Sequence, residues 1–96
     1  MPLAFEWDSG KAKSNLRKHG VSFDEACSVF EDSWATIFPD EDHSNGEERE
    51  IIVGYSILDR VLLVNFTERF RDRVRIISAR KATRIEQKEY EENIGS

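Results

Sequence analysis

Residues 61–84 read VLLVNFTERFRDRVRIISARKATR, and this stretch decides the fold. Apolar residues occupy every second position at Leu62, Val64 and Phe66 and again at Val74 and Ile76, which is the period expected of a β-strand with one buried face. A short charged segment, residues 69–72, separates the two runs. We therefore predict two neighbouring antiparallel strands.

The alternation assigns the side chains of these strands to two faces. Helices should cover one face only, as is usual for an antiparallel sheet. The side chains predicted to lie on that core face are Leu62, Val64, Phe66, Val74 and Ile76. Those predicted to lie on the open face are Leu63, Asn65, Thr67, Arg73 and Arg75. Strict alternation would turn Arg80 toward the core. We therefore expect the strand to end near Ala79, so that Arg80 and Lys81 project from the sheet edge.

Segments upstream of this hairpin complete the sheet. Arg49–Ile57 alternates and is rich in β-branched residues, and Leu58–Arg60 should join it to the next strand as a tight turn. Trp34–Phe38 and Phe5–Trp7 are two further predicted strands.

Two helices are predicted between the first two strands. Asp8 can cap a helix that ends at His19, with Gly20 as a left-handed stop. Ser22 and Glu25 have the spacing of a capping box, which would open a second helix.

A third helix should close the chain, because Thr83 and Glu86 form another capping box before a helix that runs to about Asn93. The order is then strand, helix, helix, four strands and helix. This order predicts a single α+β domain over residues 1–96, with two N-terminal helices packed on a mostly antiparallel sheet and a C-terminal helix.

Positive charge is concentrated in one segment of an acidic protein. Residues 69–84 carry a net charge of +6 whereas the whole chain carries −5, so the other residues sum to −11. The basic residues of the segment are Arg69, Arg71, Arg73, Arg75, Arg80, Lys81 and Arg84. Arginine predominates, and its planar guanidinium matches phosphate oxygens two at a time. The segment is either a solvated charged face or a binding site for an anion such as phosphate.

Three other side chains have both a structural and a functional interpretation. Glu68 adjoins the arginines and is either a surface ion-pair partner or a general base. His19 ends a helix, where it either complements the helix dipole or joins Lys18 in a binding rim. Cys27 is either a nucleophile or a buried, inert thiol, and its place among apolar positions of a predicted helix favours the inert thiol.

Composition and motifs disfavour several classes of protein. The content of 39% hydrophobic and 34% charged residues is typical of a globular protein rather than a disordered one. We find no membrane-spanning run and no signal-peptide pattern, and a single cysteine fits a reducing cytoplasm. The acidic run Asp40–His43 lacks a second ligand group at metal spacing, so we predict neither a metal nor a cofactor.

Two blocks of the sequence resemble the two ends of BrnT-type toxins. The first runs from Phe5 and includes KHGVSFDEA at 18–26, and the second includes ISARKAT at 77–83 and runs to Glu91. The sequence departs from the family pattern at Leu58–Arg60, where a glycine before the arginine is expected. The resemblance implies a RelE-like fold and a metal-independent ribonuclease toxin of a type II toxin–antitoxin pair. It also implies a cognate antitoxin that neutralises the toxin, with operator DNA bound through the antitoxin.

The leading hypothesis is therefore an RNA endonuclease that uses the 2′-hydroxyl of RNA as its nucleophile. Arg75, Arg80 and Lys81 would clamp the phosphate and its transition state, and Glu68 would act as the base or orient it. The residues expected to steer the RNA backbone are Arg69, Arg73, Lys18 and His19. The alternative is a non-catalytic interaction module that docks an acidic partner protein through the Arg-rich segment. Direct DNA binding is less favoured, because no predicted helix is both basic and placed like the recognition helix of a DNA-binding motif.

Overall fold

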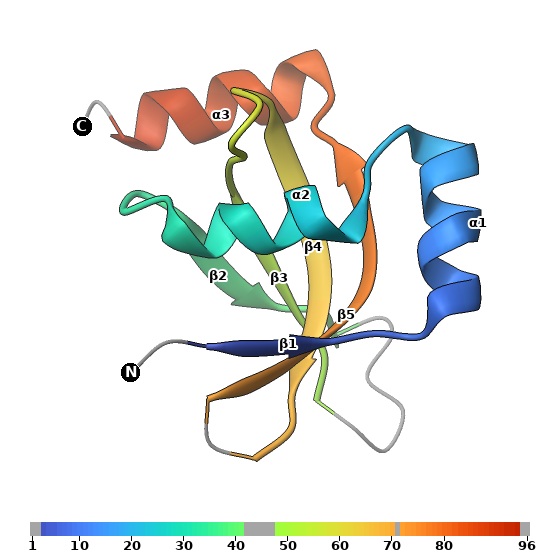
Figure 1. Cartoon of the computed structure of the whole chain (residues 1–96). Coiled ribbons are helices and arrows are strands. Elements are labelled where there is room, and N and C mark those ends of the chain that lie inside the picture. Colours follow the sequence, from blue (N-terminus) through green and yellow to red (C-terminus); the bar gives the residue numbers. More distant parts are fainter. Residues whose placement is uncertain (1–2, 42–47, 71, 95–96) are drawn as a thin grey trace.

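A computed structural model describes residues 3–41, 48–70 and 72–94. The elements in chain order are β1 (Ala4–Glu6), α1 (Ser9–His19), α2 (Phe23–Ser28), the 3-10 turn η1 (Val29–Glu31), β2 (Thr36–Pro39), β3 (Glu50–Tyr55), β4 (Val61–Glu68), β5 (Arg73–Lys81) and α3 (Arg84–Ile94). This order confirms the predicted α+β class (Figure 1). His43 and Arg71 lie outside the described residues. No described helix is long and apolar enough to cross a membrane.

The described strands form one sheet in the order β1-β5-β4-β3-β2. Neighbours from β2 to β5 pair antiparallel, whereas β1 pairs parallel to β5. The mostly antiparallel sheet is therefore confirmed. Figure 1 shows β1 beside the lower part of β5, at the edge of the sheet opposite to β2.

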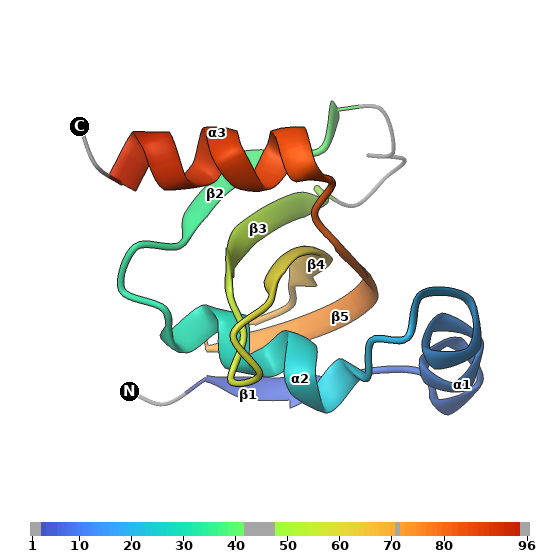
Figure 2. The same ribbon diagram turned by 90° about the horizontal axis from the view of Figure 1, so that it is seen from above.

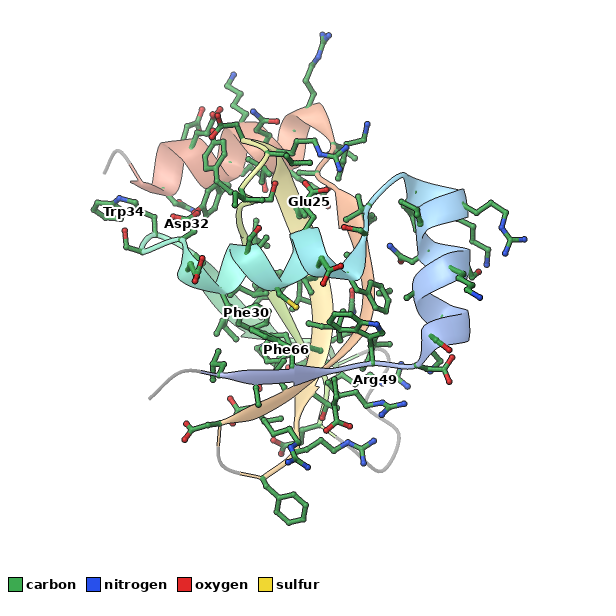
Figure 3. The ribbon with its side chains drawn as sticks, viewed as in Figure 1. Glu25, Phe30, Asp32, Trp34, Arg49 and Phe66 are labelled. Atoms are coloured by element: carbon green, nitrogen blue, oxygen red, sulfur yellow. The ribbon has the colours of Figure 1, made fainter. Side chains whose placement is uncertain are left out.

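Helices lie on both sides of this sheet, with α2 on one side and α3 on the other (Figure 2). The face toward α2 is the predicted core face, and its Leu62, Val64 and Phe66 are at most 1% exposed. Phe30 of η1 stacks edge-on against Phe66 with ring centroids 5.0 Å apart (Figure 3). Each of these buried side chains contributes about 1.5–3 kcal/mol to folding. The predicted register of β4 is confirmed.

The second face is not open along its whole length, so the prediction of a sheet covered on one side was wrong. Tyr90 of α3 packs with Val53, Val61 and Leu63, and Leu63 is 8% exposed. Thr67 is buried for a different reason, because its hydroxyl donates to the carbonyl of Glu48 at 2.7 Å. The C-terminal helix supplies a second, smaller core that alternation within the strands could not reveal.

The β3–β4 hairpin is anchored to α2 by an ion pair between the half-buried Arg60 and the buried Glu25. Ser22 Oγ accepts the Glu25 backbone N–H at 3.0 Å, which is half of the predicted capping box. The Glu25 carboxylate does not complete the box. It accepts instead from Arg60 Nε at 2.9 Å and from Ser56 Oγ at 2.6 Å. The Arg60 hydrogen bonds outweigh burial and lower the pKa of this carboxyl, since a buried carboxylate requires a cationic partner.

Helix α1 has the predicted ends but attaches to the sheet in an unexpected way. Asp8 caps it by accepting the Lys11 N–H at 2.9 Å, and Gly20 ends it with a φ of 68°. Leu16, at an apolar position of the helix, is 53% exposed. The buried residue is Asn15, whose side-chain amide bonds to the backbone of β5 at Ala79. The attachment of α1 therefore includes a buried polar contact to the edge of β5.

Candidate functional site

Strand β5 contains a β-bulge that decides where its basic side chains point. Ile76 pairs with Phe66 and Ser78 pairs with Asn65, so Ile77 has no partner on β4. An unpaired residue reverses the alternation that follows it. Ala79 consequently lies on the core face, opposite Val64, while Arg80 lies on the α3 face, opposite Leu63. The prediction that the strand ends near Ala79 was wrong, because pairing continues to Lys81.

The bulge places Arg75 and Arg80 on the same face of the sheet. Arg75 lies opposite Thr67, and Ser78 lies between the two arginines. Roughly 16 Å of strand separates their Cα atoms. Asn65 lies beside Ser78, and its amide donates to Asp40 at 2.7 Å. A strip of polar and cationic groups therefore follows β5 along the part of this face that Tyr90 does not cover.

Internal carboxylates hold both arginines. Arg80 donates two parallel hydrogen bonds to Glu86, of 2.8 and 2.9 Å. Glu86 also accepts the Thr83 N–H at 2.8 Å and donates its own N–H to Thr83 Oγ1 at 3.1 Å, so this capping box is confirmed. The Arg80 hydrogen bonds are the main cause that lowers the pKa of the Glu86 carboxyl to about 2. The Arg80 side chain is still 43% exposed, so its guanidinium is accessible from solvent.

A second carboxylate, from the edge strand β1, holds the other end of the strip. Glu6 lies 3.1 Å from Arg75 and 3.6 Å from Arg73. Glu6 and Arg75 are directly opposite each other in the parallel β1–β5 register. The acid that accompanies these arginines is therefore Glu6 rather than the predicted Glu68.

Two of the predicted catalytic side chains lie apart from this strip. Lys81 pairs with Leu62 on the core face, and its charge contributes to lowering the pKa of Glu25 on α2. Glu68 pairs with Val74 and lines a hollow of about 200 Å³ with Glu48, Glu50 and Thr67. Burial and then the charge of Glu68 raise the pKa of Glu50. The surroundings of Glu68 are therefore acidic.

The predicted rim residues lie together near the middle of the strip. A hollow of about 190 Å³ between α1 and β5 is lined by Lys11, Ser14, Asn15, Lys18, His19, Ile77 and Ser78. Lys18 and His19 are exposed on α1 and share this hollow with Ser78. Arg69 lies at the far end, in the β4–β5 turn, where its N–H donates to the Arg73 carbonyl at 2.9 Å. The structure thus connects the two sequence blocks at α1 and β5.

Two further groups bear on the possible chemistry. Burial raises the pKa of the half-buried Cys27 thiol to about 12, as expected of an inert cysteine. No cluster of three or more His, Cys, Asp or Glu side chains suited to a metal occurs among the described residues.

Comparisons with known proteins relate this arrangement to a family. Residues 7–86 match the family described as "Ribonuclease toxin, BrnT, of type II toxin-antitoxin system". The structure is similar to the 1.1 Å crystal structure of the Brucella abortus ribonuclease toxin BrnT, with a TM-score of 0.68 and 23% sequence identity. The similarity covers 85% of this chain and 99% of that one, and at this identity it shows the fold alone. No curated protein matches the chain.

Proposed function

Because the chain belongs to the BrnT family of ribonuclease toxins of type II toxin–antitoxin systems, we propose that it cleaves RNA without a metal and thereby inhibits translation and growth. The observation that supports this proposal is the strip along β5, where Arg75 and Arg80 face the same way on a sheet surface that also carries Ser78 and Asn65. A phosphodiester backbone laid along β5 would meet a guanidinium at each end of the strip.

The chemistry proposed for this strip is an internal phosphoryl transfer. The RNA 2′-oxygen attacks the adjacent phosphorus and its proton passes to a base. The bond to the 5′-oxygen of the next nucleotide breaks, and this oxygen takes up a proton from the protonated base or from water. The first products carry a 2′,3′-cyclic phosphate and a 5′-hydroxyl. Arg80 would bind the non-bridging oxygens of the scissile phosphate and stabilise the charge that grows on them in the transition state, and Arg75 would bind a phosphate toward the other end of the strip. Glu86 and Glu6 hold the two guanidiniums in place before RNA binds, which lowers the cost of orienting them.

The other predicted site residues would act at different places on the surface around the strip. Lys18 and His19 would guide the RNA from the α1 hollow onto the strip, and Arg69 and Arg73 would attract the backbone near the β4–β5 turn. Glu68 is the base predicted from sequence, but nearby Glu48 and Glu50 would repel a phosphate there. A Glu68→Gln variant that keeps full cleavage activity would remove Glu68 from the mechanism.

The partner proposed for this site is the cognate antitoxin. We propose that an antitoxin segment with acidic or aromatic side chains lies over the Arg69–Lys81 region and blocks access of RNA to the strip. Operator DNA would be bound through the antitoxin. A complex structure that leaves Arg75 and Arg80 open would contradict this mode of neutralisation.

The decisive experiment is cleavage of a labelled RNA by purified, antitoxin-free protein in EDTA. Cleavage should persist, and the products should carry 2′,3′-cyclic or 3′-phosphate ends. Arg80→Ala protein prepared in the same way controls for contaminating ribonuclease. Loss of activity in EDTA that magnesium or zinc restores would reject the metal-independent mechanism. If folded protein cleaves no RNA yet binds its antitoxin through the Arg-rich segment, the non-catalytic alternative holds.

A further inference from the structure

We infer that Asn15 is a positioning residue for RNA cleavage: its side chain locks the register of β5 beyond the bulge, and this register turns Arg80 toward the α3 face. The inference rests on the proposed role of Arg80 in binding the scissile phosphate. It concerns a residue of α1 that need not contact RNA.

The Asn15 amide takes the place of a strand along the outer edge of β5. Strand β1 pairs with β5 only across Arg73–Arg75, so it ends before the bulge. Beyond it, Asn15 Oδ1 accepts the Ala79 N–H at 3.0 Å, and Asn15 Nδ2 donates to the Ala79 carbonyl at 2.8 Å. A residue on a neighbouring strand would form the same pair of hydrogen bonds. The Asn15 side chain therefore satisfies both backbone groups of one residue on β5.

A third hydrogen bond fixes the amide itself. Asn15 Nδ2 also donates to the carbonyl of Val21 at 3.0 Å, in the segment that connects α1 to α2. Asn15 is only 5% exposed, so water competes little for these bonds. The Asn15 amide is consequently a rigid, fully bonded support and not a mobile surface side chain.

The position of this support matters because Ala79 lies between the bulge and Arg80. The backbone N–H and C=O of a residue in an antiparallel strand both point to the same neighbour, and those of the next residue point to the other side. In the observed register Ala79 points outward to Asn15, and Arg80 is paired with Leu63. A slip of one residue would point Ala79 toward β4 and exchange the faces of Arg80 and its neighbours. Asn15 therefore favours the register that places Arg80 beside RNA.

A purely stabilising role for Asn15 makes a different prediction. Unpaired strand edges are often covered for stability alone, and in that case loss of Asn15 would act independently of Arg80. A positioning role instead requires that the effect of Asn15 on cleavage vanish once Arg80 has been removed.

The test compares Asn15→Ala, Arg80→Ala and the double variant in cleavage of one labelled RNA, at a temperature where all are folded. Asn15→Ala should lower kcat by about a hundredfold, the effect expected when a catalytic group is displaced by an ångström, while KM changes by less than about threefold. In the Arg80→Ala background the same substitution should change kcat by less than about threefold. Asn15→Asp keeps the acceptor for the Ala79 N–H but turns a carboxylate oxygen toward the carbonyls of Ala79 and Val21, so it should not recover the rate.

A matched control removes a partly buried hydrogen bond that involves no residue of β5. Tyr90→Phe loses the 2.6 Å bond from the Tyr90 hydroxyl to Asp32 and should keep its kcat. The register itself is read by NMR from the cross-strand contact between Ser78 and Asn65, which Asn15→Ala should weaken or abolish.

Two outcomes would overturn the inference. One is an Asn15→Ala protein that keeps the contact between Ser78 and Asn65, and the other is an effect on kcat that adds fully to that of Arg80→Ala. If Arg80→Ala alone retains full activity, the proposed function of Arg80 fails, and the NMR register still decides the structural part of the Asn15 inference.

Discussion

Replacement of Arg80 by alanine should nearly abolish RNA cleavage, whereas Glu86→Gln, which removes the same ion pair from the other side, should not. The two side chains form a bidentate pair with hydrogen bonds of 2.8 and 2.9 Å. Glutamine at position 86 keeps an oxygen for the Thr83 N–H, because a capping box accepts either Glu or Gln. The two variants therefore differ mainly in whether the guanidinium remains.

The expected magnitudes separate the two variants. The side chains of Arg80 and Glu86 are 43% and 33% exposed, and such a pair contributes no more than about 1 kcal/mol to stability. Either variant should thus lower the melting temperature by at most about 4–8 °C. Loss of a transition-state contact should cost about 2.7–4 kcal/mol, or about a hundred- to thousandfold in rate, by analogy with a lost oxyanion donor. Only Arg80→Ala should show the second effect.

The assay is single-turnover cleavage of labelled RNA in EDTA, with thermal melts of each variant and growth inhibition at matched expression. The reasoning is refuted if Arg80→Ala retains cleavage within about threefold of the wild type, or if Glu86→Gln is equally inactive. Lys81 is adjacent to Arg80 but lies on the opposite face of the sheet. Lys81→Ala should therefore lower the cleavage rate by less than about tenfold. An equal loss in Lys81→Ala would instead favour the joint clamp predicted from sequence.

Three further predictions follow from the ion pairs and the cysteine. The pKa of Glu86 falls from 4.5 to about 2 on folding, so its stabilising contribution is present above pH 4.5 and is lost as the pH falls toward 2; Glu86→Gln should flatten this part of the acid-unfolding curve. Arg60→Ala should cost about 3–5 kcal/mol in urea unfolding and more than Glu25→Gln, because it leaves the 4%-exposed Glu25 carboxylate without its cation; equal losses would contradict this. Cys27, with a pKa of about 12, should react with iodoacetamide on the order of a thousandfold more slowly in the native than in the unfolded chain, and rapid native labelling would contradict its burial.

Local patterns in the sequence predicted the structural features that depend on residues close together in the chain. The alternation in β4 correctly assigned Leu62, Val64 and Phe66 to the core, because the face of a side chain follows directly from its position along a strand. The ends of α1 at Asp8 and Gly20 were also predictable, since helix caps are formed by residues close in sequence.

Other features depend on contacts between distant parts of the chain and could not be predicted in this way. The bulge at Ile77 becomes visible only when β5 is aligned with β4. Without it, strict alternation would turn Arg80 toward the core, so the strand was wrongly expected to end near Ala79. Glu6 pairs with Arg75 only because β1 returns to the far edge of the sheet. Tyr90 covers Leu63 only because α3 folds back across it. The predicted site residues therefore stay a prediction, and only the tertiary structure could reveal the sheet face on which each of them lies.

The internal carboxylates also bear on how an acidic protein could bind RNA at one place. Most of its surface repels phosphate, since the residues outside 69–84 sum to −11. Glu6 and Glu86 reduce the attraction at the strip further, yet they hold Arg75 and Arg80 in defined orientations. RNA would exchange carboxylate contacts for phosphate contacts, so binding in the ground state should be weak. The reaction would be accelerated in the transition state, because the negative charge that grows on the phosphate oxygens attracts the Arg80 guanidinium more strongly than the Glu86 carboxylate does. An antitoxin does not have to stabilise a transition state. Its carboxylates can therefore compete with RNA for this strip through ground-state binding alone.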